Sequence, residues 1–221
     1  MRTNFLALHL PFYPEILPQV PANSKSLFKF YQDRSLEYLL VVSPPDFIKK
    51  DVFEYKKLLC DKIGSYCSYR SIAHLTIACF LMDKKREKAL HNSLQIIAAE
   101  QSKIAFSING FKAFKTSGTV YMLINEKKAF SNLSKNICQK TLIANISSKY
   151  KTITTVPHLT IGKQLEERFV TAYHFLREQS YNQTFIADGI LLLRRNNQNK
   201  YEPVQAFPFL SKSPAQLSFL S

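Results

Sequence analysis

Cysteine is scarce in this chain of 221 residues, and its spacing excludes a disulfide-built fold. The four cysteines contain no C-x-x-C pair; they are Cys60, Cys67, Cys79 and Cys138. This number is too small to staple a chain of this length, so the pattern indicates reduced, partly buried thiols. Such thiols are typical of a cytoplasmic protein.

A long apolar segment is also absent. No stretch approaches the roughly 20 apolar residues that a membrane-spanning helix needs. The N-terminal apolar run is interrupted by His9, Pro11 and Pro14, and no small-residue cleavage pattern follows it. We therefore expect a cytoplasmic protein with no membrane association.

Acidic residues are few relative to basic ones. Thirty Lys and Arg stand against 16 Asp and Glu, which gives a formal net charge of +14. This surplus favours polyanionic partners, among them nucleic acid, nucleotides and anionic membranes. A lysine-rich proteome would produce the same surplus, so charge alone does not choose a function.

The chain divides into three parts by composition. Residues 1–34 are mixed apolar and Pro-rich and then basic, which indicates an N-terminal extension. Residues 35–212 carry regular strand and helix patterns, and residues 213–221 form a short tail. With 46% hydrophobic residues, the body is large enough for one core or for two small lobes.

Strand and helix patterns alternate through the body. The strand patterns cover residues 37–43, 68–82, 103–114, 119–126, 154–165, 183–196 and 200–209. The helix patterns cover residues 46–64, 83–102, 127–146 and 165–179. We expect a turn at residues 115–118 and a closing hairpin formed by the last two strand patterns.

The four-letter word HLTI occurs twice, at His74 and at His158, although the chain has only five histidines. The two histidines are 84 residues apart, and a helix pattern follows each motif directly. This long-period repeat predicts two similar lobes.

Each motif places an imidazole next to a hydroxyl. Side chains alternate along a β-strand, so His74 and Thr76 share one face, while the two apolar residues of the motif pack on the other. The second motif pairs His158 with Thr160 in the same way. We expect Lys163, which follows Thr160, to lie on the same strand face.

Two such pairs that meet across a cleft suit a phosphodiester. Histidine titrates near neutral pH, so one imidazole can remove a proton from the attacking oxygen while the other protonates the leaving oxygen. The hydroxyls of Thr76 and Thr160 can donate hydrogen bonds to the non-bridging oxygens, and Lys163 can offset the charge that develops.

The histidines also allow other interpretations. A single strand histidine is more often structural than catalytic, but the repeated motif argues against that reading. Two histidines could also bind zinc, yet no acidic or thiolate partner stands at a recognisable spacing, and Cys79 lies in an apolar stretch. His9, His91 and His174 are expected to be surface or capping residues.

The paired motifs resemble the 2H phosphoesterase superfamily, which includes the bacterial 2′-5′ RNA ligase-like proteins and RNA cyclic phosphodiesterases. The resemblance covers about residues 36–209, through YLLVVSPP, AHLTIACFL, GFKAF, VYMLIN, VPHLTIGK, ILLLRR and YEPVQAFPF. It implies an α+β fold in which duplicated lobes of antiparallel sheet, related by a pseudo-two-fold, carry outer helices around a central cleft.

The resemblance also implies roles for the motif residues. His74 and His158 would be the general acid and base, and Thr76 and Thr160 would bind phosphate, without metal or cofactor. Lys163 stands where several relatives have arginine, which keeps the charge but loses the bidentate geometry. Residues 1–34 have no counterpart in compact members; their aromatic residues could stack on a base, but packing on the body is favoured. The aromatic residues of this extension are Phe12, Tyr13, Phe28, Phe30 and Tyr31.

We therefore expect a monomeric, metal-independent phosphodiesterase that acts on 2′,3′-cyclic phosphate or 2′-5′-linked nucleotide or RNA substrates. One alternative is an RNA-binding module that uses the same basic cleft without turnover. Another keeps the catalysis but acts on a small cyclic or 2′-5′-linked oligonucleotide, or on a non-nucleotide phosphoester. Tyr69, Arg70 and Phe114 are candidate walls of the cleft, with ordinary packing the simpler reading for each.

Overall fold

The structure, a computed structural model, describes residues 35–195 and 200–213. The expected N-terminal extension with its five aromatic residues, and all of the tail beyond residue 213, lie outside the described residues. The division into extension, body and tail therefore stays a prediction.

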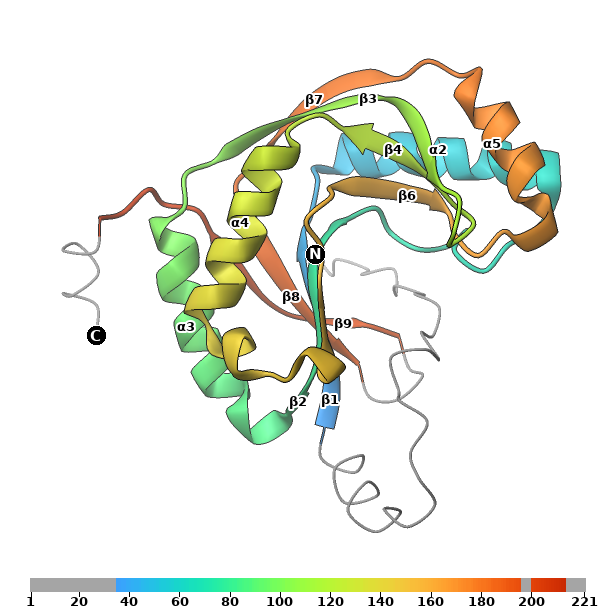
Figure 1. The fold of residues 1–221 in the computed structure, drawn as a ribbon. Coiled ribbons are helices and arrows are strands. Elements are labelled where there is room, and N and C mark those ends of the chain that lie inside the picture. Colours follow the sequence, from blue (N-terminus) through green and yellow to red (C-terminus); the bar gives the residue numbers. More distant parts are fainter. Residues whose placement is uncertain (1–34, 196–199, 214–221) are drawn as a thin grey trace, which may run out of the picture.

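Two antiparallel sheets form the centre of the fold (Figure 1). The first has five strands in the order β5-β2-β1-β8-β9, with bounds Lys151–Ile153, Leu75–Asp83, Ser35–Val42, Gly189–Arg195 and Glu202–Pro208. The second has four strands in the order β6-β4-β3-β7, with bounds His158–Gly162, Thr119–Ile124, Ile104–Phe114 and Asn182–Ala187. Each sheet contains one HLTI motif, at β2 and at β6.

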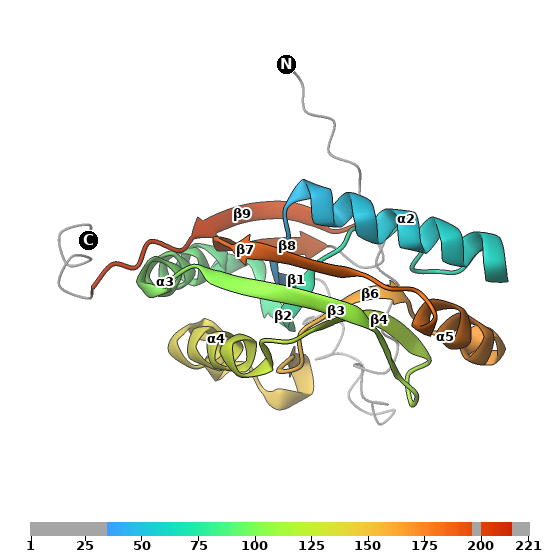
Figure 2. The same cartoon turned by 90° about the horizontal axis from the view of Figure 1, so that it is seen from above.

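The helices are exchanged between the two sheets. Their bounds are Asp46–Ile63 for α2, Glu87–Glu100 for α3, Lys127–Lys140 for α4 and Phe169–Arg177 for α5. Helix α2 follows β1 of the five-stranded sheet, yet it packs against β6 and α5 of the other lobe. Helix α4 follows β4 of the four-stranded sheet, yet it packs against α3, β2 and β5. Figures 1 and 2 show α2 beside α5 and α4 beside α3.

The sequence of α2 explains its bounds. Two prolines precede it, Asp46 lies in its first turn where the helix dipole favours an acid, and Lys62 lies in its last turn. Gly64 ends it with φ of 78°, a left-handed value that favours glycine. Its buried stripe consists of Ile48, Val52, Lys56 and Leu59. A lysine thus occupies a core position of this helix.

One continuous core joins the lobes. Buried apolar side chains from both sheets and all four described α-helices form a single cluster. The expected fold class is confirmed: the protein is α+β, with two antiparallel lobes that carry outer helices.

Some element predictions were wrong. Residues 183–196 are not one strand: β7 ends at Ala187 in the four-stranded sheet, and β8 begins at Gly189 in the other. A Cβ at Gly189 would lie 2.6 Å from the carbonyl oxygen of Phe207, so the crossing requires glycine. The run of apolar residues hides this change of sheet. Strand β5 was not predicted, and the helix expected to continue to residue 146 ends at Lys140, followed by a 3-10 turn at Leu142–Asn145.

Candidate functional site

A cavity of about 920 Å³ lies between the lobes and brings both motifs together. All five predicted site residues line it: His74, Thr76, His158, Thr160 and Lys163. The side chains within both motifs alternate as expected, since the apolar residues Leu75, Ile77, Leu159 and Ile161 are fully buried in the core. Two segments far apart in the sequence therefore present imidazole and hydroxyl groups to one space.

A β-bulge follows each motif threonine. In the β1–β2 pair, Val41 faces Thr76 and the next partner is Ala78, so Ile77 is the extra residue. In the β4–β6 pair, Ile161 is the extra residue in the same way. A bulge shifts the alternation by one residue and re-aims the side chains that follow.

The bulge explains how Lys163 reaches the cavity. Lys163 comes three residues after Thr160, a spacing that regular alternation would place on opposite faces. Lys163 lies one residue beyond the end of β6 at Gly162, so it is not on the strand as expected, and the extra residue brings it to the cavity side, although the sequence gives no sign of the bulge. Cys79 holds the equivalent place after Thr76, and it too lines the cavity.

The two imidazoles are held in the same manner. Nδ1 of His74 lies 2.8 Å from the carbonyl oxygen of Ile72, and Nδ1 of His158 lies 2.9 Å from that of Val156. A carbonyl only accepts, so in each case Nδ1 carries the proton and donates it. Nε2 of each neutral ring is then the atom with a free electron pair, which can take up a proton.

The surroundings favour the neutral form of both rings. Burial, helped by the nearby Lys56, His158 and Lys163, lowers the pKa of His74 to about 4. Burial and the charge of Lys163 also lower the pKa of His158. Both imidazoles are therefore neutral at pH 7, and an anion bound beside them would raise both pKa values.

Sequence reasoning missed three residues behind the motifs. Ser68 and Ser71 line the cavity. Nζ of the buried Lys56 donates hydrogen bonds to both serines. The available signal was a lysine within the apolar stripe of α2, four residues after Val52. The serines gave no signal.

Aromatic rings form one wall of the cavity. Phe114 lines it, stands edge-on to the His158 ring at 5.1 Å between centroids, and stacks on Tyr121 at 4.3 Å. The other two candidate walls do not line it. Tyr69 stacks on Phe53, in agreement with the packing alternative, and Arg70 is exposed.

The loop beyond β6 completes this side of the cavity. Gln164 and Glu166 line it, and they have left-handed φ values of 52° and 49°. Such backbone costs energy for residues other than glycine and persists where packing enforces it. The turn at residues 115–118 packs against this loop: Leu165 N–H donates to the Gly118 carbonyl at 3.1 Å.

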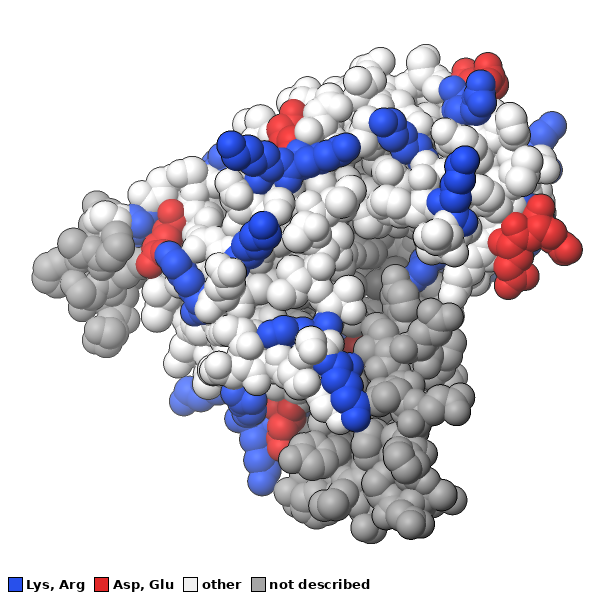
Figure 3. Space-filling model, viewed as in Figure 1, with Lys and Arg blue, Asp and Glu red and all other residues white. Residues whose placement is uncertain are grey.

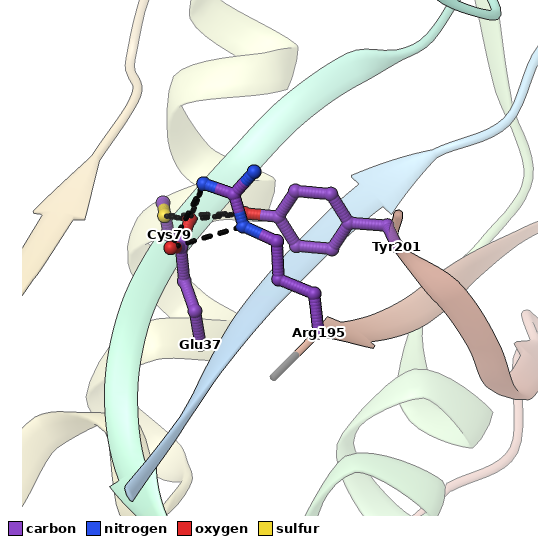
Figure 4. A network of polar contacts seen from close by, with 4 residues as sticks. All are labelled: Glu37, Cys79, Arg195 and Tyr201. Carbon is purple, nitrogen blue, oxygen red and sulfur yellow. Dashed lines mark hydrogen bonds and ion pairs between the residues drawn. The ribbon is translucent and has the colours of Figure 1, made fainter. Parts of the chain in front are cut away.

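A second polar cluster, formed by Glu37, Cys79, Arg195 and Tyr201 (Figure 4), also lines the cavity. Arg195 donates to both carboxylate oxygens of Glu37, at 2.9 Å from Nη2, and its guanidinium lies 4.5 Å from the ring centre of Tyr201. Tyr201 and Cys79 also donate to Glu37. Burial and the Glu37 charge raise the pKa of the Cys79 thiol to about 12, so this thiol is unreactive at neutral pH.

The two other described histidines, His91 and His174, are not among the residues that line the cavity. His174 is exposed on α5, as expected. His91 was expected at the surface, but its Nε2 is buried and its ring meets Phe207 edge-on, because α3 packs against β9. His9 lies outside the described residues.

Metal-binding groups and membrane-spanning helices are both absent from the described residues. Within residues 35–195 and 200–213, no group of three or more His, Cys, Asp or Glu side chains is placed to hold a metal ion. No helix in the same residues combines the length and apolarity needed to cross a membrane. Basic side chains outnumber acidic ones on the face drawn in Figure 3.

The fold and cavity define a class: an α+β protein of two antiparallel lobes, each of which contributes one H-x-T motif to a shared cleft. The family model of the 2′-5′ RNA ligase superfamily matches the sequence of this chain over residues 44–199. The chain belongs to this superfamily, and so to the 2H phosphoesterases, as the resemblance implied. The members of this family are phosphoesterases.

Solved structures show the same fold. The Thermus thermophilus protein TT0787 has a TM-score of 0.59 at 12% identity, and 80% of this chain covers 100% of it. Escherichia coli LigT in complex with 3′-AMP has a TM-score of 0.56 at 14% identity, with coverage of 79% and 98%. A structure described as a phosphoesterase gives 0.58 at 14% identity, with coverage of 79% and 98%. A search of curated protein sequences found no match.

Proposed function

We propose that the protein is a metal-independent phosphodiesterase that acts on 2′,3′-cyclic phosphate or 2′-5′-linked nucleotide or RNA substrates. The observation that carries this proposal is the matched pair of imidazoles that line one cavity, each with Nδ1 tied to the carbonyl two residues before it. This arrangement leaves both Nε2 atoms for proton transfer.

In the proposed reaction, one imidazole accepts a proton from water, or from a ribose hydroxyl, as that oxygen attacks phosphorus. The other imidazole, protonated beforehand, gives its proton to the ribose oxygen as the bond from phosphorus to that oxygen breaks. The lowered pKa values suit the base, and the negative phosphate would raise the pKa of the acid. The near-symmetry of the site leaves the assignment of acid and base to the orientation of the substrate.

Thr76, Thr160 and Lys163 are the proposed phosphate-binding residues. The threonine hydroxyls would donate to the non-bridging oxygens, and the Lys163 ammonium would offset their charge in the transition state. The aromatic wall at Phe114 would support a base or ribose next to the phosphate. LigT, a structural relative, has been solved with 3′-AMP, ATP and NADP+, which supports a nucleotide in this cavity.

The test is a substrate screen with 2′,3′-cyclic nucleotides, 2′-5′ dinucleotides and RNA that ends in a cyclic phosphate. We expect turnover by the wild type in the presence of EDTA, and a loss of about 100-fold or more in His74→Ala and in His158→Ala. His174→Ala, on an exposed helix face, is the matched control and should retain activity. Full turnover by either active-site variant would overturn the mechanism.

The second candidate, an RNA-binding module without turnover, is favoured by one observation, the net charge of +14. It predicts tight RNA binding that weakens steeply with salt, and no product after long incubation. The same screen separates the two candidates.

A further inference from the structure

Lys56 is buried in the middle of α2 without an acidic partner. Its side chain is 1% exposed. Nζ donates to the carbonyl oxygen of Ser68 at 3.1 Å, and to the carbonyl oxygen and Oγ of Ser71, both at 2.6 Å. An ammonium has three N–H donors, so these contacts use all of them. Within the part of the chain that the structure describes, no salt bridge to Lys56 is found.

A charge in this place is expensive. An ammonium taken out of water without a counter-ion loses solvation that neutral acceptors restore only in part. Burial lowers the pKa of Lys56 to about 7, because loss of solvation disfavours the charged ammonium. A methionine would fill the same stripe of α2 without it. The position of the lysine suggests what it does instead.

Lys56 lies where the two halves of the site meet. Ser71 directly precedes Ile72, whose carbonyl holds the His74 ring. Ser68 accepts the hydrogen bond from Lys56 at its carbonyl, and its Oγ accepts the backbone N–H of Lys163 at 3.0 Å. Lys56 is thus connected to the first motif through Ser71 and to the loop after the second motif through Ser68.

We propose that Lys56 is a positioning residue of the phosphate site, because its ammonium fixes the turn at residues 68–71 and thereby joins the His74 half to the Lys163 half. This inference deepens the proposed function and rests on it. Lys56 itself does not line the cavity, so it acts through the two serines and through its charge. A phosphate bound in the cavity would serve as its counter-ion.

The charge of Lys56 acts on His74 together with the charges of His158 and Lys163. The other titratable side chain bonded to Lys56 is Tyr66, whose hydroxyl donates to the Lys56 carbonyl at 3.2 Å. Removal of the ammonium should therefore weaken the repulsion that keeps His74 neutral, and leave the other two charges in place.

The decisive variant is Lys56→Met, with Lys57→Met on the same helix as the matched control. Lys57 is half-exposed and pairs with Glu54 on the surface. An NMR titration of the His74 ring should show its pKa raised in Lys56→Met by about half a unit or more, and unchanged in Lys57→Met. Turnover of a 2′,3′-cyclic nucleotide should fall about 10-fold in kcat in Lys56→Met, with a matching shift of the acid limb of kcat/KM.

The titration does not depend on catalysis, so it separates two failures. If the wild type turns over no substrate but His74 shifts in Lys56→Met, the proposed function fails and the coupling of Lys56 to His74 stands. If the wild type is active and Lys56→Met retains both its kcat and the His74 pKa, Lys56 is only a structural residue and the inference is overturned.

Ser68→Ala provides a second variant that keeps the ammonium and its contact with the Ser68 carbonyl. It removes only the bond to the Lys163 N–H, so KM should rise about 10-fold, while the pKa of His74 stays as in the wild type. This variant keeps the inference testable if Lys56→Met does not fold. An unchanged KM in folded Ser68→Ala would contradict the path from Lys56 to Lys163.

Discussion

Ile77 and Ile161 occupy the same place in the two halves of the molecule: each is the extra residue of a β-bulge, directly after the motif threonine. Both are fully buried. The bulges set a spacing of three residues between groups that face the cavity, from Thr76 to Cys79 and from Thr160 to Lys163. The repeat therefore extends beyond the four letters, to the backbone that follows them.

The hydroxyls of Thr76 and Thr160 can be tested by replacement with valine, which keeps the branched shape. We expect kcat/KM on a cyclic nucleotide to fall about 100-fold in each variant, since each loses one donor to the phosphoryl group. Thr184→Val, at an exposed position of β7, is the control and should match the wild type. An active Thr76→Val would remove that hydroxyl from the proposed site.

The pH dependence of catalysis follows from the two lowered histidine pKa values. The base must be neutral and the acid must be protonated, so kcat/KM should peak below pH 6.5, the ordinary pKa of histidine. The optimum for kcat should lie at higher pH, because bound phosphate raises both pKa values. Steady-state kinetics from pH 4 to 9 would check this, and a kcat/KM optimum above pH 7 would contradict it.

Stability should fall in mild acid because of His74. The pKa of this group is 6.5 in the unfolded chain and about 4 in the folded protein. Between these values the unfolded chain binds a proton that the folded protein does not, so lower pH favours unfolding. Through this group the free energy of unfolding should drop by about 2 kcal/mol from pH 7 to pH 5. Urea unfolding of His74→Asn should show a smaller drop, and an equal drop in both proteins would refute the assignment.

The polar cluster of Glu37, Cys79, Arg195 and Tyr201 should matter for stability. Glu37→Gln removes the carboxylate from Arg195, whose side chain is 3% exposed. Because loss of one partner leaves a buried charge, we expect unfolding to become easier by about 2–3 kcal/mol. Glu178→Gln, which breaks the exposed pair with Arg177, should have little effect. The double variant Glu37→Met/Arg195→Met should recover part of the loss; if it is less stable than Glu37→Gln, the buried charge is not the cause.

Gly118 offers a test of the loop that borders the cavity. Its φ is +54°, and an added Cβ would lie 3.3 Å from the backbone nitrogen of Leu165. Gly110 has φ of +64° with nothing near its Cβ position, so Gly110→Ala measures the backbone strain alone, about 1–2 kcal/mol. Gly118→Ala should cost more and should also lower turnover, because its turn lines the cavity. Equal stability and activity in the two variants would show that the contact with Leu165 is unimportant.

The sequence indicated the parts of the fold that local patterns encode. The bounds of α2 follow from the prolines before it, Asp46 and Gly64, and the repeat of HLTI placed one motif in each lobe. The sequence did not show the change of sheet at Asp188, because the apolar run continues through it. The short strand β5 gave too few residues for a pattern.

The candidate site was visible in part for the same reason. Residues within one motif report their own alternation, so His74 and Thr76 were found together. Lys56 is separated from Ser71 by 15 positions, and Glu37 from Arg195 by 158, so no local pattern joins them. Bulges have no fixed sequence signature, and the face of Lys163 therefore needed coordinates.

The exchange of α2 and α4 has a consequence for how the chain can be divided. A fragment that stops after β3 would contain α2 but lack β6 and α5, the elements that cover its apolar stripe. The complementary fragment would keep β5 but would leave α4 without α3 and β2. Neither half is a self-sufficient unit, whereas two co-expressed halves hold complementary surfaces, and activity restored by their reassembly would report that each half completes the other.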